Sequence, residues 1–328
     1  MGAVASKQDA TRATATPSLS VRVRVGAQRF ESEDTRSYEL APLGGSSLAP
    51  YAPGAHIDLL LPNGLSRQYS LLPRPNGDVY RIGVKREQTS RGGSSYIHDE
   101  MRVGDIVSIS EPRNHFALHL GAAYSILLAG GIGVTPILSI AEALKQHGAR
   151  FEFLYACRDE ASAAFLGDVR AHPQARVHFD AVEGGPPRML DVVANAPRDA
   201  HIYCCGPTPM IDACEAACLT RPDITLHVER FAAAHEAAVE GGFVVELARS
   251  RRSIAVEKGQ SILAALTAAG VDVPRSCEEG VCGSCETRVL AGVPDHRDSI
   301  LTEKERAQNA VMMVCCSGSR SPVLRLDL

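Results

Sequence analysis

The sequence predicts a multidomain protein of the α/β plus β class, with an antiparallel β-barrel, a parallel-sheet α/β domain and a small mixed domain in that order. Its 328 residues exceed the usual size of a single core, so two or three domains are expected. Short strand-like runs fill the first third of the chain, and apolar strands alternate with helices in the second. The last third contains closely spaced cysteines, which predict a metal centre.

The barrel is predicted over residues 19–120, after an Ala- and Thr-rich tail of residues 1–18 that is expected to be disordered. The expected strands are Leu19–Val25, Ser37–Leu40, His56–Leu61, Ser66–Leu72, Val79–Val84 and Ile106–Ser110, with one helix near Ser94–Glu100. Strands of this length and spacing, separated by Gly, Pro and Asn turns, are typical of an antiparallel barrel. The first six residues also match the N-myristoylation pattern, which is short enough to arise by chance.

Within the barrel, the run Arg67-Gln68-Tyr69-Ser70 suits a flavin nucleotide. Strand alternation puts Arg67 and Tyr69 on one face, where a guanidinium can grip a phosphate and a phenol ring can stack on a flat heterocycle. The glycines of Arg91-Gly92-Gly93-Ser94-Ser95 open a helix whose N–H groups and Ser94 hydroxyl can complete a phosphate cradle. An ordinary surface arginine beside a half-buried tyrosine is the alternative, and FMN and FAD both remain open.

The α/β domain is predicted over residues 121–231. The apolar strand Tyr124–Leu128 leads into the turn Ala129-Gly130-Gly131-Ile132-Gly133-Val134-Thr135-Pro136, and Ile137–Gln146 has helical spacing. Strand, glycine turn and helix form half of a nucleotide-binding βαβ unit, with the helix N-terminus open to a diphosphate. Further strands are expected at Phe151–Cys157, Val177–Ala181, His201–Cys205 and Thr225–Glu229, with helices at Ser162–Ala171, Met189–Asn195 and Pro209–Leu219.

The expected strand His201–Cys205 continues into Cys205-Gly206-Pro207. Open α/β sheets bind ligands at the carboxyl ends of their strands, and the thiol of Cys205 is a small polarisable contact for a planar ring. Cys204 is interpreted as core. After an earlier strand, Asp159 favours NADH through an adenosine ribose, whereas Arg158 could equally serve the 2′-phosphate of NADPH.

Residues 232–242 read as a linker, and residues 243–328 as a small mixed domain around the cysteines. Cys277, Cys282 and Cys285 have the C-x4-C-x2-C spacing of a plant-type [2Fe–2S] loop, with a fourth ligand at Cys315 or Cys316. A zinc site, the alternative, usually shows paired C-x2-C units. The expected elements are Phe243–Leu247, Ser253–Val256, Ser261–Ala269, Thr287–Ala291 and Met312–Val314.

Composition excludes several classes of protein. A formal net charge of −4 provides no basic field for nucleic acid and no polybasic patch for a membrane. No apolar run reaches the length of about 18 residues that a membrane span needs. The ten cysteines stand in a chain that is neither small nor led by a signal peptide, so they are expected to be reduced and the protein cytoplasmic.

These residues together resemble the phthalate dioxygenase reductase family over nearly the whole chain after the tail. The matching stretches are Arg67-Gln68-Tyr69-Ser70, Arg91-Gly92-Gly93-Ser94, Ala129–Pro136, Tyr203-Cys204-Cys205-Gly206-Pro207, Glu229-Arg230-Phe231, the cysteine loop and Asp295-His296-Arg297-Asp298. The resemblance implies a flavin-binding barrel that holds FMN, an NAD-binding domain and a C-terminal ferredoxin domain of the β-grasp fold.

The resemblance also implies roles for particular residues. Arg67, Lys85 and Ser94 would hold the FMN phosphate, Tyr69 and Ser70 would contact the isoalloxazine ring, and Cys315 would be the fourth iron ligand. Ser70, Cys205 and Phe231 are the candidate catalytic residues, with Phe231 at the junction of the three domains. The full set of candidate cofactor-binding residues is Arg67, Gln68, Tyr69, Ser70, Val84, Lys85, Gly92, Gly93, Ser94, Gly130, Gly131, Gly133, Thr135, Pro136, Arg158, Asp159, Cys205, Gly206, Pro207 and Phe231.

The expected function is electron transfer from NADH to FMN, to the [2Fe–2S] cluster and then to a partner. NADH delivers two electrons as a hydride whereas the cluster accepts one, so the flavin is needed between them. The resemblance implies a Rieske-type oxygenase of aromatic acids as the partner. A monomer is expected, because one chain that carries all three centres can do this work alone. The alternatives are the reductase of an O-demethylase or amine monooxygenase, and a redox sensor.

Overall fold

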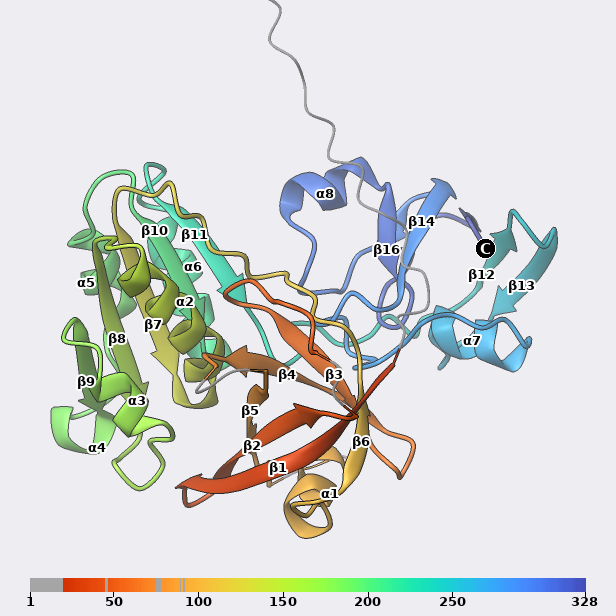
Figure 1. Ribbon diagram of the computed structural model, residues 1–328. Helices are drawn as coiled ribbons and strands as arrows, with labels where there is room; N and C mark the ends of the chain where they lie inside the picture. Colours follow the sequence, from red (N-terminus) through yellow and green to blue (C-terminus); the bar gives the residue numbers. More distant parts are fainter. Residues whose placement is uncertain (1–19, 45–46, 75–77, 89, 91) are drawn as a thin grey trace, which may run out of the picture.

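The computed structural model describes residues 20–328 except 45–46, 75–77, 89 and 91. The predicted tail, the myristoylation pattern, Leu19 and Arg91 therefore lie outside the described residues. Figure 1 shows three bodies: a barrel from the N-terminal part of the chain, a sheet covered by helices from the middle part, and a smaller C-terminal body beside the barrel.

The N-terminal body is a closed antiparallel barrel with the strand order β1-β2-β5-β4-β3-β6, as predicted. β1 continues past the predicted end at Val25 through two irregularities of register and reaches Ser32. Valine and tyrosine side chains that alternate along β1 and β2 point into a core of apolar residues. The elements are β1 (Val21–Ser32), β2 (Thr35–Pro42), β3 (His56–Leu60), β4 (Ser66–Leu72), β5 (Tyr80–Lys85), α1 (Gly93–Asp99) and β6 (Ile106–Ile109).

The middle body is a five-stranded parallel sheet with the order β11-β10-β7-β8-β9, which confirms the predicted α/β class. The order reverses between β7 and β10, where sheets of this kind bind ligands. Its strands are β7 (Ser125–Gly130), β8 (Phe151–Cys157), β9 (Ala175–Phe179), β10 (His201–Cys205) and β11 (Thr225–Glu229). Its helices are η1 (Gly131–Gly133), α2 (Val134–Gln146), α3 (Leu166–Arg170), α4 (Asp180–Glu183), α5 (Met189–Ala194) and α6 (Thr208–Cys218).

Two predicted boundaries in the middle body were wrong. The strand expected over Val177–Ala181 ends at Phe179, because Asp180 begins the one-turn helix α4. The helix expected over Ser162–Ala171 is only Leu166–Arg170, because Phe165 adopts a left-handed conformation with φ of 57° and is buried in the core. Thr135 and Pro136, expected in the turn, belong to α2.

The C-terminal body is a mixed sheet with the order β13-β12-β18-β14-β16, with a two-stranded β15–β17 ribbon beside it. Its strands are β12 (Phe243–Leu247), β13 (Arg252–Val256), β14 (Glu286–Ala291), β15 (Pro294–Asp295), β16 (Val311–Met313), β17 (Gly318–Ser319) and β18 (Val323–Leu326); its helices are α7 (Ile262–Ala268) and α8 (Glu303–Gln308). The sequence interpretation missed β18 and α8, although Thr302 and Glu305 form the capping box that marks a helix start.

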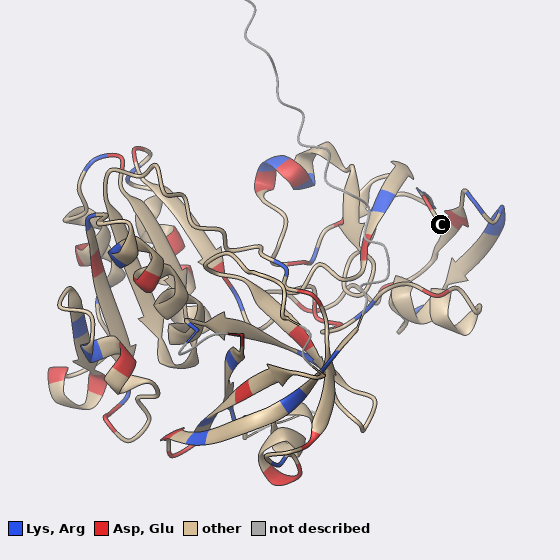
Figure 2. Cartoon of the chain, in the orientation of Figure 1, with Lys and Arg blue, Asp and Glu red and all other residues tan. Residues whose placement is uncertain are grey.

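The three bodies meet in different ways. Leu72 and Phe116 from the N-terminal part belong to the same buried cluster as the middle sheet, so these two bodies share a core. The buried cluster of the C-terminal body contains only its own residues. Residues 232–242 lie on that body: the amide of Ala234 donates to Ser299 Oγ at 3.1 Å, and that of Ala238 donates to the Cys316 carbonyl at 2.8 Å. Figure 2 shows acidic and basic residues interspersed over all three bodies.

Candidate functional site

On the barrel, Arg67 of β4 lies against the start of α1. A Cβ atom added to Gly93 would stand 2.5 Å from Arg67 Nε, so only glycine lets the arginine lie across the first turn. Gly92, the residue before the helix, has φ of 88°, which also favours glycine. Arg67 donates to the Ser66 carbonyl at 2.8 Å. The structure thus brings a guanidinium to a short glycine-lined helix start, which suits a phosphate.

Ser70, on the same strand, has a buried hydroxyl whose hydrogen bonds are not satisfied within the described residues. The residue is 4% exposed, and its hydroxyl is buried without a hydrogen-bond partner among the described residues. Buried hydroxyls are nearly always paired, so a group from outside the chain fits here. Burial raises the pKa of Tyr69, which keeps its phenol neutral. Both observations fit a flat, polar-edged ring such as a flavin.

The other predicted flavin contacts are engaged within the protein. Lys85 Nζ lies 3.8 Å from Asp34 and 4.0 Å from Glu87. Ser94 Oγ accepts from the Glu87 amide and donates to Ser90 Oγ, both at 3.1 Å. Gln68 donates to Asp58 at 3.1 Å, and the Val84 side chain is fully buried in the barrel core. A phosphate would therefore compete with Asp34 and Glu87 for Lys85.

In the middle body, the glycine turn after β7 packs directly on the segment after β10. A Cβ atom on Gly133 would collide with the Cys205 carbonyl, and one on Gly130 would stand 2.6 Å from Pro207 Cδ. Thr135 Oγ1 donates to the Ile132 carbonyl at 3.0 Å and closes the turn. The predicted residues Gly130, Gly131, Gly133, Cys205, Gly206 and Pro207 are thus brought together at the point where the strand order reverses.

Glu229 is a functional candidate to which the sequence interpretation gave no role, although it lies in the matching stretch Glu229-Arg230-Phe231. It is the register partner of Cys205, at the carboxyl ends of β11 and β10. Its Oε2 atom is buried without a hydrogen-bond partner among the described residues, and burial raises the pKa of its carboxyl to about 8. Burial, followed by the nearby Glu229, also raises the pKa of the Cys205 thiol. The signal available in the sequence was an acidic residue ending a strand beside Cys205.

Three further predicted residues flank this site. Phe231, two residues after Glu229, is 42% exposed, and Arg230 between them donates to Asp212 and Glu215 at 2.8 Å each. Asp159 follows β8 and accepts from the Ser162 amide at 2.9 Å, and this hydrogen bond lowers the pKa of its carboxyl. Arg158 is largely exposed, with Glu33 at 3.8 Å.

The cysteine loop is shaped by left-handed backbone positions. Gly280 and Gly283 have φ of 72° and 74°, and Glu278 has φ of 57°. The Glu279 amide donates to Cys277 Sγ at 3.3 Å, and the Ser284 amide donates to Cys282 Sγ at 3.4 Å. Amides directed at sulfur are what an iron–sulfur cluster needs, because they offset its negative charge.

The four predicted ligands are buried and gather in two pairs. The neighbouring Cys277 side chain lowers the pKa of the Cys282 thiol, and the Cys285 side chain, followed by that of Cys316, lowers the pKa of the Cys315 thiol. In the described part of the chain, no group of three or more His, Cys, Asp or Glu side chains is arranged to hold a single metal ion. Two thiol pairs suit two irons better than one zinc ion.

Cys316 takes a different position from Cys315. A Cβ atom on Gly280 would collide with its sulfur, so the Cys316 side chain fills the space beneath the loop. It lies 3.8 Å from the Met313 carbonyl, to which it can donate. Cys316 thus serves as packing in this arrangement, and Cys315 is the thiol that is paired with Cys285.

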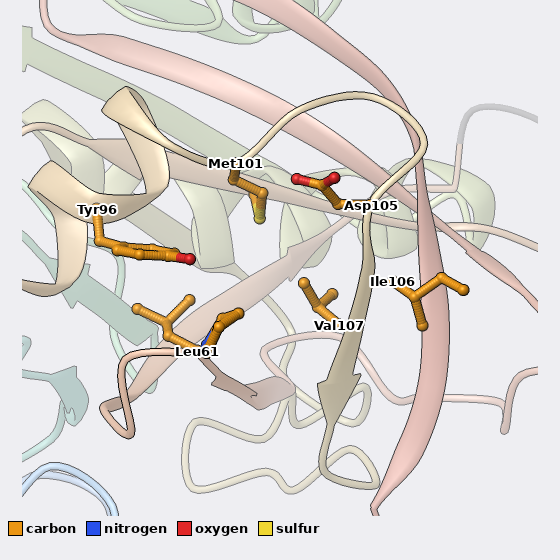
Figure 3. A pocket seen from close by; sticks show the side chains of 7 residues that line it. Leu61, Tyr96, Met101, Asp105, Ile106 and Val107 are labelled. Carbon is orange, nitrogen blue, oxygen red and sulfur yellow. The ribbon is translucent and has the colours of Figure 1, made fainter.

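One cavity, of about 250 Å³, lies elsewhere on the barrel. Figure 3 shows Tyr96 and Leu61 facing Met101, Asp105 and Val107 across it. None of its lining residues is a candidate site residue. Among the described residues, no helix is long and apolar enough to cross a membrane.

Three features indicate a pyridine-nucleotide-dependent flavoprotein with an iron–sulfur centre. They are glycine-lined turns that suit phosphates, a buried Cys–Glu pair at a reversal of strand order, and a loop of three cysteines with Cys315 beside it. Comparisons with known proteins agree with this class. Residues 127–216 match the oxidoreductase NAD-binding domain family, and residues 245–319 match the 2Fe-2S iron-sulfur cluster binding domain family.

Several curated relatives are similar over almost their whole length. Phenoxybenzoate dioxygenase subunit beta of Ectopseudomonas oleovorans is 47% identical, covering 94% of this chain and 97% of that protein. Tetrachlorobenzoquinone reductase of Sphingobium chlorophenolicum is 43% identical, covering 90% and 94%. Phthalate dioxygenase reductase of Burkholderia cepacia is 37% identical, covering 94% and 97%.

Solved structures are similar to this chain over nearly all of its length. A phthalate dioxygenase reductase structure matches with a TM-score of 0.70 and 36% identity, covering 94% of this chain and 98% of the other. An intact type IV self-sufficient cytochrome P450 monooxygenase matches with a TM-score of 0.85 and 36% identity. This chain covers 94% of its own length there but only 41% of the P450 chain.

The chain belongs to the phthalate dioxygenase reductase family. It is an NADH-dependent iron–sulfur flavoprotein oxidoreductase whose cofactors are FMN, NADH and a [2Fe–2S] cluster. Its relatives include a dioxygenase subunit, a vanillate O-demethylase oxidoreductase and a phthalate dioxygenase reductase. The solved phthalate dioxygenase reductase is described as a modular structure for electron transfer from pyridine nucleotides to [2Fe-2S].

Proposed function

We propose that this protein delivers electrons to a Rieske-type oxygenase that acts on an aromatic acid. The observation that carries the proposal is the placement of a cluster loop directly beside the flavin strand: Ser276 Oγ lies 3.0 Å from Ser66 Oγ of β4. Its similarity to phenoxybenzoate dioxygenase subunit beta and phthalate dioxygenase reductase supports an aromatic acid as the oxygenase substrate. The chain is also 41% identical to a vanillate O-demethylase oxidoreductase, so the oxygenase that it reduces could instead be an O-demethylase.

The roles proposed for the residues follow from the geometry. Arg67, Gly92, Gly93, Ser94 and Lys85 would hold the FMN phosphate, while Tyr69 and Ser70 would contact the ring. The bound flavin supplies the step that divides a hydride into single electrons. The turn at Gly130, Gly131 and Gly133, with Gly206 and Pro207, would bind NADH so that nicotinamide lies near Cys205, Glu229 and Phe231. Asp159, charged and already oriented by Ser162, supports NADH over NADPH.

Cys277, Cys282, Cys285 and Cys315 would bind the cluster, two thiolates to each iron. The proposed domain limits remain 19–120, 121–231, 232–242 and 243–328, with the linker lying on the C-terminal domain. A monomer is sufficient for this function because all three centres are in one chain. Free thiols at all ten cysteines support a reducing cytoplasm.

The direct test is anaerobic titration of the purified protein with NADH, followed by addition of candidate oxygenases. Flavin and iron–sulfur absorption should both bleach, with roughly one and a half NADH consumed for three electron equivalents. Rieske oxygenases should then reoxidise the protein in proportion to product formed. Reoxidation by a cytochrome P450 and by no Rieske oxygenase would overturn the proposed partner.

The role of Arg67 can be tested separately. Arg67→Ala removes a charge-assisted hydrogen bond to phosphate worth about 1.5–3 kcal/mol, so FMN should dissociate roughly 10- to 100-fold more readily. Ultrafiltration followed by flavin fluorescence of the filtrate measures this. Arg29→Ala, whose exposed side chain on β1 pairs with Glu39 at 2.9 Å, is the matched control. Equal retention by both variants would contradict the assignment.

A second candidate function is direct reduction of a quinone, since one relative is a tetrachlorobenzoquinone reductase at 43% identity. Quinones accept electrons one or two at a time and need no protein docking. Steady-state oxidation of NADH by a halogenated benzoquinone, compared with oxidation by an oxygenase at equal concentration, distinguishes the two functions.

A further inference from the structure

Two buried polar atoms without partners lie on adjacent strands beside the flavin site. His56 opens β3 and is the register partner of Ser70 in β4. Directly opposed residues of antiparallel strands share a face, with Cβ atoms about 4.5–5.5 Å apart. His56 is 5% exposed, and neither its Nε2 nor Ser70 Oγ has a hydrogen-bond partner among the described residues. Such a pair suits a chain of hydrogen bonds completed by a bound group.

From His56 the arrangement continues to His115. The two imidazole rings have centroids 5.5 Å apart and planes inclined by 32°. The backbones of His56 and Arg113 exchange two hydrogen bonds, of 2.8 and 2.9 Å, which fixes the segment of His115 beside β3. His115 itself is exposed to solvent. The two histidines therefore connect the buried face of β3 and β4 to water.

The same face carries the cluster loop. A Cβ atom on Gly283, between the ligands Cys282 and Cys285, would stand 3.1 Å from His115 Nε2. Ser66, which shares its face of β4 with Ser70, meets Ser276 just before Cys277. Figure 1 shows the C-terminal body lying beside β3 and β4. Any proton that leaves this junction starts close to where the electrons leave.

The balanced reaction of NADH with the cluster releases such a proton. NADH and two oxidised clusters yield NAD⁺, two reduced clusters and one H⁺, because the hydride loses two electrons on its way to the clusters. Resting on the proposed function, we propose that Ser70, His56 and His115 form the route by which this proton leaves the flavin for solvent. Ser70 would receive it at the ring edge, His56 would pass it through its imidazole, and His115 would release it. His56 is thus a relay that acts through Ser70.

The surroundings keep His56 in the form that a relay needs. The charged and titratable groups near it are Arg113, which is paired with Asp58 at 2.7 Å, and His115. Burial, then Arg113 and His115, lower the pKa of His56 to about 3. The imidazole is therefore neutral, with one nitrogen that donates and one that accepts. A neutral imidazole can take a proton on one side as it gives one up on the other.

The kinetic test is stopped-flow mixing of the complete protein with NADH and a pH-indicator dye. In His56→Gln, flavin reduction should stay within about twofold, while cluster reduction and proton release should slow by about 10- to 100-fold. Imidazole in solution should restore much of the rate to His56→Gly. His147→Gln, at the end of α2, is the matched histidine control. Unchanged cluster reduction in His56→Gln, or slowing that imidazole does not relieve, would overturn the relay.

An equilibrium test needs no turnover. FMN added to deflavinated protein, followed by fluorescence, should bind about 3- to 10-fold more weakly to Ser70→Ala and to His56→Gln. The double variant should bind no more weakly than either single variant, because the two residues act as one chain. Additive losses would contradict the coupling. If NADH reduces no flavin even in the unaltered protein, the proposed function fails; normal turnover with an unaffected His56→Gln variant removes the relay alone.

Discussion

The cluster loop and the nicotinamide site are built in opposite ways. Three of the four proposed iron ligands come from one nine-residue stretch, Cys277 to Cys285, shaped by the left-handed backbone of Gly280 and Gly283. The proposed nicotinamide site joins Gly133, Cys205 and Glu229, which follow or end three different strands of the parallel sheet. The first site depends on local chain geometry, whereas the second depends on the packing of the whole middle body.

The two sites should therefore respond differently to substitution. A change in the loop should remove its cofactor and leave the remaining protein folded, because the core of the C-terminal body lies mostly outside the loop. A change at the strand ends should alter both binding and stability, since Cys205 belongs to a core shared with the barrel.

The largest effect is expected for Cys282→Ser, which removes a proposed iron ligand. The iron–sulfur absorption and EPR signal should be lost and oxygenase-coupled turnover should fall by at least about 100-fold. Flavin reduction by NADH should remain within about twofold. Cys218→Ser, on α6, is the matched thiol control. Loss of flavin reduction in a folded Cys282→Ser protein would show that the loop and the nicotinamide site are not independent.

The next effect concerns pH and Glu229. Burial raises the pKa of its carboxyl to about 8 from 4.5, so the folded protein holds a proton that the unfolded chain loses. This contribution to the free energy of unfolding is fully present below about pH 4.5 and is lost as pH rises through about 8. Glu229→Gln should remove this dependence, a difference of roughly 3–5 kcal/mol between the two limits. Urea unfolding at pH 5 and pH 9 measures it.

In that experiment the glutamine variant should gain stability over the unaltered protein as the pH rises. Glu257→Gln, an exposed position after β13, controls for the general effect of removing a carboxyl. Parallel pH profiles for the unaltered protein and Glu229→Gln would mean that the carboxyl is solvated and does not belong to the buried site.

The same contrast explains what could be read from the sequence. The cysteine spacing, the barrel and the order of domains depend on local patterns, so they were predictable. Glu229 was not assigned, because its importance depends on β11 pairing with β10, which no local pattern states. The short α3 has a similar origin, because burial of Phe165 in a left-handed conformation depends on tertiary packing.

A smaller effect is expected for Gly133→Ala. The new Cβ atom would meet the Cys205 carbonyl, which is backbone and cannot turn aside. The turn should move away from the Cys205 segment, costing about 1–3 kcal/mol in stability and raising KM for NADH more than it lowers kcat. Gly167→Ala, with open space around its Cβ position, is the control. Unaltered KM in Gly133→Ala would show that this turn does not shape the NADH site.

The smallest effect is expected at the contact between the barrel and the cysteine loop, where Ser66 of β4 is hydrogen-bonded to Ser276. Ser66→Ala removes one neutral hydrogen bond, so the free energy of unfolding should fall by no more than about 1 kcal/mol. Because the shared core of barrel and middle body does not include the C-terminal body, this contact helps hold the cluster loop on β4. Cluster reduction should therefore slow about two- to threefold with flavin reduction unchanged, measured by stopped flow. Ser108→Ala on β6 is the control; equal slowing in both would show that the contact does not position the loop.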